Sequence, residues 1–231
     1  MDKDMENMQE FLMGEVLLCG LLGRALYEDP DRAWLEQLIR DDVFSEVPLG
    51  AGQEDVERGR QILDQWAKKF TAGLTNEEFD AIQKDKFYLF AGVGKPLAPV
   101  WESVYFSKSR LIFQEQTLQV RNWYARYGLQ FERMNNEPDD HIGVELSFLA
   151  HLATLALNAL ENQNQASADG LVQNQRDFLS EHLLRWAPAW SELVQKNART
   201  DFYRGLGSLT LGALMTIARQ LNVEMPQKEV M

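Results

Sequence analysis

Apolar residues recur at steps of three and four along almost the whole chain, and this spacing is the feature that most limits its fold. The first stripe places seven residues on one helix face: Met5, Met8, Leu12, Val16, Cys19, Leu22 and Leu26. Comparable stripes occur in at least five later segments, at 56–70, 113–127, 142–160, 179–190 and 202–217. No segment shows the alternation of apolar and polar residues that is typical of a half-buried strand. The sequence therefore predicts an all-α fold, a multi-helix bundle of eight to eleven helices.

Polar residues beside these stripes indicate where individual helices begin. Thr75 and Glu78 have the spacing of a capping box, in which the Thr75 hydroxyl accepts an amide hydrogen and Glu78 bonds back. Asp29 followed by Pro30 predicts an N-cap and the first position of another helix.

The helical pattern is interrupted at residues 129–139. This segment includes Asn135-Asn136-Glu137-Pro138, a composition that is typical of a loop. We therefore expect an N-terminal helical lobe over 1–128, a hinge loop over 129–139 and a C-terminal helical lobe over 140–231.

Composition and charge exclude several classes of protein. Of the 231 residues, 45% are apolar, which is enough for a buried core. The 35 acidic and 23 basic side chains give a net charge of −12, which argues against nucleic-acid binding. The first residues are net acidic, and the longest apolar run is far shorter than the ~20 residues that span a bilayer. We expect a soluble cytoplasmic protein without a membrane span, and we expect its only cysteine, Cys19, to be buried.

Glu137, Asp140, His141 and Glu145 are candidates for a metal site, because His141 and Glu145 are four residues apart and share a helix face. A di-iron bundle needs paired Glu-x-x-His motifs, and the sequence has none. An acidic cap at the start of a helix explains the same residues. We therefore expect no metal site, and we expect the other histidines to be core or rim residues: His151 and His182.

Two further segments have partial catalytic signatures. Gly92-Val93-Gly94-Lys95-Pro96 is similar to part of a phosphate-binding loop, but Pro96 replaces the hydroxyl residue and helix precedes it. The nucleotide signal is therefore weak, and we expect no cofactor. Ser103 beside Glu102 lacks the Gly-x-Ser-x-Gly turn of a hydrolase. We therefore expect that the chain is not an enzyme, and a nucleotide- or metal-dependent enzyme is the alternative from a different class.

Three motifs follow one another along the chain. Tyr88-Leu89-Phe90-Ala91-Gly92 comes first, and a segment from Pro99 that ends in Glu102-Ser103-Val104-Tyr105 comes second. Glu137-Pro138-Asp139-Asp140-His141 is the third, and it leads into Glu145-Leu146-x-Phe148. Arg121-x-x-Tyr124-x-x-x-Gly128 lies between the second and the third. Together these motifs, above all the Glu-Pro-x-Asp-His element, resemble the TorD/DmsD family of redox-enzyme maturation chaperones.

The resemblance implies an all-helical protein with a larger N-terminal lobe and a smaller C-terminal lobe. It implies a cytoplasmic chaperone that binds the twin-arginine signal peptide and the apo form of a molybdopterin oxidoreductase. Such a chaperone assists cofactor insertion and prevents premature export. The resemblance also implies a monomer or a dimer, and the expected hinge would permit domain swapping. It further implies that weak GTP binding is possible, which the segment from Gly92 to Lys95 does not exclude. The alternative within this class is an assembly factor for a non-exported respiratory reductase, such as nitrate reductase.

A twin-arginine signal has a basic part and an apolar part, so its receptor needs carboxylates and an apolar groove. Motif position and this chemistry together select the expected peptide-binding residues: Leu89, Phe90, Pro99, Trp101, Glu102, Tyr105, Glu137, Asp139, Asp140 and His141. We expect Asp140 and His141 to be held but accessible, at the mouth of a groove between the lobes.

Overall fold

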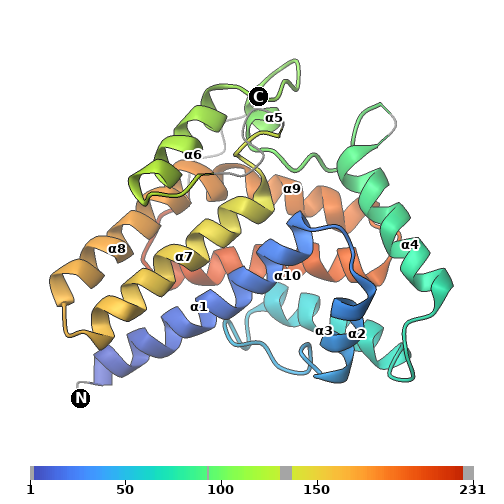
Figure 1. Ribbon diagram of the computed structural model, residues 1–231, viewed down its shortest axis with the longest axis horizontal. Helices are drawn as coiled ribbons and strands as arrows, with labels where there is room; N and C mark the ends of the chain where they lie inside the picture. Colours follow the sequence, from blue (N-terminus) through green and yellow to red (C-terminus); the bar gives the residue numbers. More distant parts are fainter. Residues whose placement is uncertain (1–2, 93, 131–136, 226–231) are drawn as a thin grey trace. The chain divides into compact units, whose positions relative to one another are not determined.

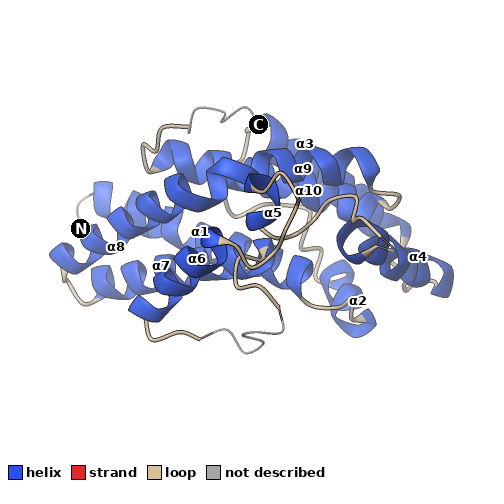
Figure 2. Cartoon of the chain, turned by 90° about the horizontal axis from the view of Figure 1, so that it is seen from above, coloured by secondary structure: helices blue, strands red, loops and turns tan. Residues whose placement is uncertain are grey.

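The computed structural model describes residues 3–92, 94–130 and 137–225, and these residues form helices and loops without a strand (Figures 1 and 2). The helices are α1 (Lys3–Tyr27), α2 (Arg32–Arg40), α3 (Glu54–Lys69), α4 (Asn76–Lys86), α5 (Ser103–Phe106), α6 (Glu115–Arg126), α7 (Ile142–Glu161), α8 (Gln165–Phe178), α9 (Leu184–Asn197) and α10 (Asp201–Gln220). Two π-helical turns, η1 (Phe87–Ala91) and η2 (Leu179–Leu183), continue α4 and α8. The predicted all-α fold is confirmed.

The chain divides into two compact units, each assembled from separated stretches of sequence. Unit 1 contains Met1–Tyr27, Trp101–Ala187 and Ile217–Met231, and unit 2 contains Glu28–Val100 and Pro188–Thr216. Unit 1 therefore combines the beginning, the middle and the end of the chain, and unit 2 combines an early segment with a late one.

The expected lobes do not coincide with these units. Residues 101–128 and 140–187, which were assigned to different lobes, belong together in unit 1. The expected hinge, 129–139, joins α6 to α7 inside unit 1, and its residues 131–136 lie outside the described part of the chain. An apolar stripe shows which face of a helix is buried but not which other helix covers it. The role of the hinge in domain swapping stays a prediction.

In unit 1, α7 packs against both α1 and α8, and the three helices run side by side (Figure 1). His141 caps α7, because its Nδ1 atom accepts a hydrogen bond from the Gly143 amide at 3.0 Å. By length and composition, α7 is the one described helix that could cross a membrane, but 61% of its most apolar stretch is buried inside the structure. The core helix of a soluble protein has the same properties.

Two glycines, Gly23 and Gly143, allow α1 and α7 to approach each other closely. A Cβ atom added at Gly143 would lie 2.7 Å from the Gly23 carbonyl oxygen, and one added at Gly23 would lie 2.9 Å from the Gly143 carbonyl oxygen. Both distances are shorter than van der Waals contact, so a larger residue would push the helices apart. The same approach brings Tyr27, at the end of α1, against His141, with 5.2 Å between the ring centroids.

In unit 2, α3 and α10 pack at a similar close contact. A Cβ atom added at Gly59 would lie 2.8 Å from the Leu209 Cα atom, and one added at Gly212 would lie 2.8 Å from the Val56 Cα atom. Because backbone atoms form these contacts, a change of side-chain rotamer cannot relieve them. Unit 2 is therefore also organised around a glycine-lined helix pair.

Two expected helix starts differ in detail from the structure. Thr75 caps α4 as predicted, because its hydroxyl accepts the Glu78 amide hydrogen at 3.1 Å. The Glu78 carboxylate, however, accepts a hydrogen bond from the Trp66 indole at 2.9 Å, so this contact joins α4 to α3. The N-cap of α2 is Asp31 rather than Asp29, and it accepts an amide hydrogen at 2.7 Å.

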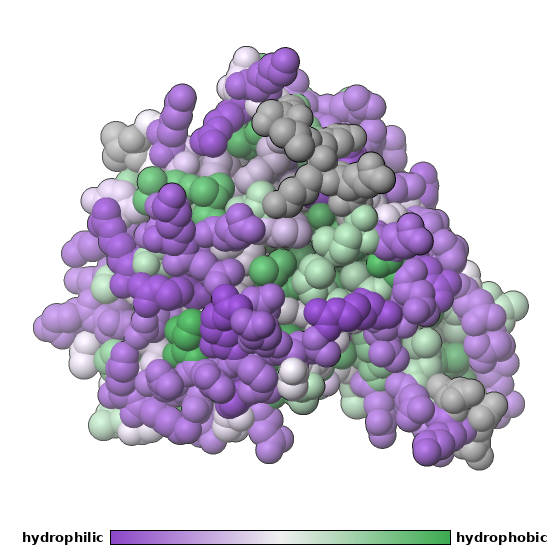
Figure 3. Space-filling model, turned by 180° about the vertical axis from the view of Figure 1, so that it is seen from behind, coloured by the Kyte–Doolittle hydropathy of each residue, from purple (hydrophilic) through white to green (hydrophobic). Residues whose placement is uncertain are grey.

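Hydrophilic side chains cover most of the face shown in Figure 3, and apolar side chains gather in smaller areas between them. The loop between α5 and α6 exposes three successive apolar residues: Leu111, Ile112 and Phe113. The sequence placed Phe113 on a helix, but α6 begins at Glu115 and Phe113 has a φ angle of +58°. A right-handed helix does not accommodate this angle, so Phe113 lies in the loop before α6. Its side chain is exposed there.

Candidate functional site

The third sequence motif forms a short turn that enters α7 and pairs with the segment before α5. Trp101 and His141 form an isolated antiparallel bridge. Next to it, the Glu102 amide donates a hydrogen bond to the Asp140 carbonyl oxygen at 2.9 Å. The second and third motifs, which lie far apart in the sequence, are therefore neighbours within unit 1.

Asp140 links this turn to α5 and α6 by hydrogen bonds. Its carboxylate accepts hydrogen bonds from the Ser103 amide at 2.7 Å and from the Thr117 hydroxyl at 2.7 Å. Asp140 is fully buried, so the expectation that its side chain is accessible is wrong. Two donors inside the protein occupy the carboxylate, and its role is to hold the start of α5 and the side of α6 in place.

Asp139 forms an ion pair with Arg121 on α6. The Arg121 guanidinium donates to the Asp139 carboxylate through Nη2 at 2.7 Å, and through Nε to both oxygens at 3.2 Å. This hydrogen bond raises the pKa of Arg121, and the Asp139 charge adds to the effect. Tyr124, one turn later on α6, donates its hydroxyl to the Asp139 carbonyl oxygen at 3.3 Å. Three motif residues therefore hold one another.

Glu102 and Glu145 add two more fully buried carboxyl groups to unit 1. Glu102 Oε2 lies 2.8 Å from His182 Nδ1, and Glu145 Oε2 accepts a hydrogen bond from the Trp186 indole at 3.3 Å. The second oxygen of each carboxyl has no hydrogen-bond partner among the described residues. Burial raises the pKa of both groups; the nearby charges of Glu102 and Asp140 raise the Glu145 pKa further. The neutral form of Glu145 is therefore favoured.

We expect Glu145→Gln to increase the free energy of unfolding at pH 8 by about 1–3 kcal/mol, the usual range for an unpaired buried polar group. The folded-state pKa of Glu145 is raised above its ordinary value of 4.5. Its contribution to stability is therefore complete below pH 4.5 and is lost as the pH rises through the folded-state pKa. Glutamine keeps the acceptor for Trp186 and does not titrate.

Urea unfolding of both proteins between pH 4 and pH 8 measures this difference, which should grow with pH. Glu161→Gln, at the exposed end of the same helix, is the control and should change stability by less than about 0.5 kcal/mol. A difference that shrinks toward pH 8 would show that Glu145 is ionised in the folded protein.

A cavity of about 380 Å³ lies beside the motif turn, and we call it the tyrosine cavity. Its lining comes from α1, α6, the segment that follows α6, and α7: Tyr27, Tyr124, Leu129, Gln130, Val144, Ser147, Phe148 and His151. Tyr27 contacts the His141 ring, and Tyr124 binds the Asp139 backbone. The buried motif residues His141 and Asp139 therefore contact the two tyrosines that line the cavity.

The buried acids also set the electrostatic potential at these tyrosines. The pKa of Tyr124 is raised by burial, and then by nearby carboxyl groups, among them Asp140 and Asp139. A field that opposes ionisation of a tyrosine attracts a positive charge. The tyrosine cavity therefore combines apolar surface with a negative potential.

The other expected peptide-binding residues have different surroundings. Trp101 and Tyr105 are half-buried in unit 1, where their rings contact His141 and Trp186 at centroid distances of 6.3 Å and 5.2 Å. Glu137 is half-buried and begins the motif turn. The remaining three are buried and belong to unit 2: Leu89, Phe90 and Pro99.

Phe90 packs against core residues of unit 2. Its ring centroid lies 6.3 Å from that of Trp190 and 5.4 Å from that of Tyr203. Leu89 is fully buried. Within unit 2, these two side chains form core contacts, so any role in peptide binding needs a separate test.

Sequence reasoning missed two residues that complete the site. Thr117 binds Asp140, and His182 pairs with Glu102 across 80 positions of sequence. His182 was expected to be a core or rim residue, and it is buried as expected. Its pairing with Glu102 could not be predicted from the sequence, because neither the spacing nor the flanking residues of Glu102 and His182 connect the two positions. Among the described residues, no group of three or more His, Cys, Asp or Glu side chains could hold a metal ion.

More than half of the chain matches a known family. Residues 53–192 match the family described as nitrate reductase delta subunit. A Salmonella typhi protein named Tat proofreading chaperone DmsD is 33% identical over 86% of this chain and 85% of its own length. The chain belongs to the TorD/DmsD family. The resemblance seen in the motifs is thereby confirmed.

Two further relatives of the TorD/DmsD family differ in coverage. A Haemophilus influenzae protein named "Probable Tat proofreading chaperone DmsD" is 28% identical over 89% of this chain and 91% of its own length. Chaperone protein TorD of Vibrio cholerae is 38% identical over 53% of this chain and 54% of its own length. The segment matched by the family, 53–192, contains α5, α6 and α7, and therefore the whole motif turn of this TorD/DmsD member.

Proposed function

We propose that this protein is a cytoplasmic chaperone that binds the twin-arginine signal peptide and the apo form of a molybdopterin oxidoreductase. It assists cofactor insertion, prevents premature export and is not an enzyme. Membership of the TorD/DmsD family supports this proposal, because relatives are named Tat proofreading chaperones. The protein works as a monomer or a domain-swapped dimer, without a resident metal or nucleotide. Weak GTP binding by the segment from Gly92 to Lys95 remains compatible with this proposal.

The tyrosine cavity is the observation that carries the proposal. A twin-arginine signal presents two guanidinium groups and an apolar stretch, and recognition requires a negative potential beside apolar surface. The cavity is lined mainly by aromatic and aliphatic side chains, and the acids behind Tyr124 supply the negative field. The net charge of −12 adds a long-range attraction for a basic segment.

Val144→Arg is expected to weaken the binding of a twin-arginine peptide by at least about tenfold. Val144 lines the cavity on α7, and an arginine there would occupy its volume and repel the guanidinium groups of the peptide. Asn158→Arg introduces the same charge on the exposed part of the same helix and should change affinity by less than about twofold. Calorimetric titration with a synthetic peptide that has two adjacent arginines before an apolar stretch measures both.

A second peptide, with both arginines replaced by glutamine, separates the two parts of recognition. It should bind more weakly to the wild type, and Val144→Arg should then cause a smaller further loss. Equal affinity of the wild type and Val144→Arg for the twin-arginine peptide, with both proteins folded, would remove the tyrosine cavity as the binding site.

One observation favours a second client class. The family match over residues 53–192 carries the description nitrate reductase delta subunit, which fits an assembly factor for a non-exported respiratory reductase. Such a client would present an N-terminus without the cleavable twin-arginine signal. Affinity capture from a native extract, followed by mass identification of the co-purified reductase, distinguishes the two clients.

A further inference from the structure

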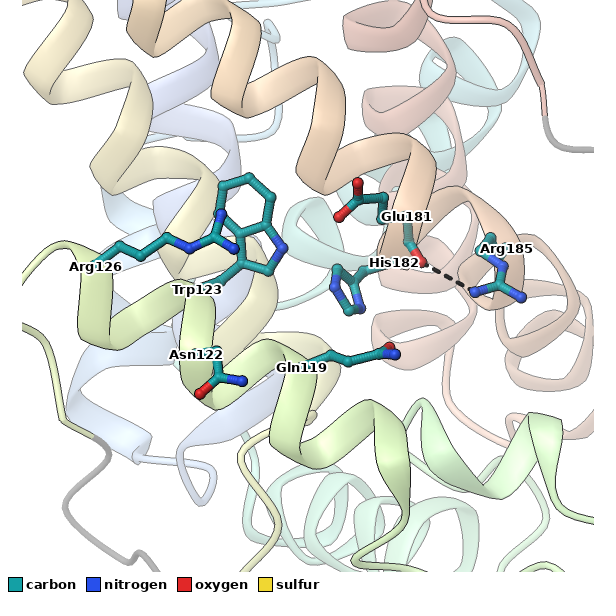
Figure 4. A pocket seen from close by; sticks show the side chains of 7 residues that line it. All are labelled: Gln119, Asn122, Trp123, Arg126, Glu181, His182 and Arg185. Carbon is teal, nitrogen blue, oxygen red and sulfur yellow. Dashed lines mark hydrogen bonds between the residues drawn. The ribbon is translucent and has the colours of Figure 1, made fainter.

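Unit 1 contains a second cavity, on a different side of α6, and no residue of the three motifs lines it. It has a volume of about 300 Å³ and is lined by side chains from α6, η2 and the start of α9 (Figure 4). We call it the His182 cavity, because the His182 side chain lies at its centre (Figure 4). No residue is shared between its lining and that of the tyrosine cavity.

His182 is buried, with 1% of its surface exposed, and its ring is fixed from two directions. Its Nδ1 atom lies 2.8 Å from Glu102 Oε2, and the Phe178 ring packs against it with 5.1 Å between centroids. The other ring nitrogen, Nε2, has no hydrogen-bond partner among the described residues, although the ring lines the cavity. An oriented polar atom that faces a cavity and has no protein partner is available to a polar ligand.

The state of Glu102 determines what Nε2 offers to a ligand. Burial raises the pKa of Glu102, and the hydrogen bond to His182 lowers it in part. A protonated Glu102 carboxyl donates to Nδ1 and leaves the proton of a neutral imidazole on Nε2. An ionised Glu102 can instead accept a hydrogen bond from Nδ1, and Nε2 then carries a proton only if the ring is protonated on both nitrogens. An acceptor atom of a ligand selects the arrangements in which Nε2 is a donor.

Two arginines stand on opposite sides of His182 in this cavity (Figure 4). The Arg126 guanidinium lies 4.3 Å above the Trp123 ring, and the Arg185 guanidinium lies 4.5 Å above the Phe106 ring. Arg185 also donates to the Glu181 carbonyl oxygen at 3.3 Å. Aromatic stacking orients both cations. In a chain with a net charge of −12, this is a local concentration of positive charge.

We propose that the His182 cavity is an oxyanion-binding site for a phosphate or carboxylate group. His182 Nε2 donates a hydrogen bond to the anion, and Arg126 and Arg185 supply the compensating charge. Glu102 is a positioning residue that orients the imidazole. The single acid in the lining, Glu181, has an exposed side chain that can turn away into solvent. The proposal stands independently of signal-peptide binding, because the two cavities have separate linings.

Nuclear magnetic resonance of the histidine ring nitrogens tests the site directly. The chain has three histidines, so the His182 signals can be assigned from single substitutions of the other two. Inorganic phosphate and succinate are titrated separately into the full-length protein, with sodium chloride holding the ionic strength constant. We expect a saturable shift of the His182 Nε2 signal, while the His151 signals, which belong to the other cavity, stay unchanged.

Arg126→Gln and Arg185→Gln should each lower the affinity for the anion by about fivefold or more. Arg40→Gln removes the same charge at an exposed position of unit 2 and should change affinity by less than about twofold. Tighter binding of phosphate would identify a phosphorylated ligand, and tighter binding of succinate a carboxylate ligand; either supports the site. A His182 signal that does not saturate with either anion, or equal weakening in Arg40→Gln, would overturn it.

Discussion

Asp140→Ala is expected to lower the free energy of unfolding by about 2–4 kcal/mol, because one buried carboxylate accepts hydrogen bonds from two separate elements. Its oxygens lie 2.7 Å from the Ser103 amide nitrogen and 2.7 Å from the Thr117 hydroxyl oxygen. Alanine removes the acceptor and leaves both donors buried without partners. Urea unfolding followed by circular dichroism measures the loss.

Thr117→Val is the matched control, because it removes only one of these hydrogen bonds and should lower stability by about 1 kcal/mol. In the double variant the losses should be less than additive, since both single changes break the same bond. Affinity for a twin-arginine peptide should fall in the same order, because Asp140 holds the turn behind the tyrosine cavity. Full stability of Asp140→Ala, together with lost affinity, would instead make Asp140 a direct contact.

Gly59→Ala should lower the stability by about 3 kcal/mol, the upper part of the range for overpacking. The new methyl group would lie 2.8 Å from the Leu209 Cα atom, so α3 and α10 must separate to admit it. Separation of the two helices weakens the apolar packing of unit 2 along their length. Thermal unfolding measures the change in stability.

Gly20→Ala on α1 makes the same chemical change in open space, because no atom lies within 4 Å of the added Cβ. Alanine is the better helix former by about 1 kcal/mol, so this variant should be as stable as the wild type or slightly more stable. Gly20 and Gly59 both lie within helices, so the gain in helix propensity is the same for both alanine variants. The difference between their stabilities therefore measures the packing at Gly59. Similar melting temperatures for the two variants would show that α3 and α10 are not in close contact.

The sequence was informative about the fold wherever the signal is local. Apolar stripes predicted the helices, because each stripe depends only on the period of one helix. The Thr75 cap of α4 was predicted for the same reason, since donor and acceptor are three residues apart. The second half of that capping box was wrong, because Glu78 binds the Trp66 indole, a partner on another helix.

The candidate site was only partly predictable. The Glu-Pro-x-Asp-His motif located the turn, but charged residues in a motif look alike whether they face a ligand or an internal donor. Asp140 is buried because Ser103 and Thr117 satisfy it, and neither partner is marked by its spacing from the motif. The pair of Glu102 and His182 joins positions 80 residues apart, and helix periodicity carries no information about such a contact.

The packing of α1 against α7 has a consequence for the order in which the protein is made. About 110 residues separate the end of α1 from the start of α7, and ribosomes add about 5–20 residues per second. The apolar stripe of α1 therefore leaves the ribosome on the order of 6–20 seconds before the helix that covers it. During this interval the nascent chain exposes a helical apolar surface to the cytosol. A protein proposed to shield the unfinished form of another is thus expected to need shielding during its own translation.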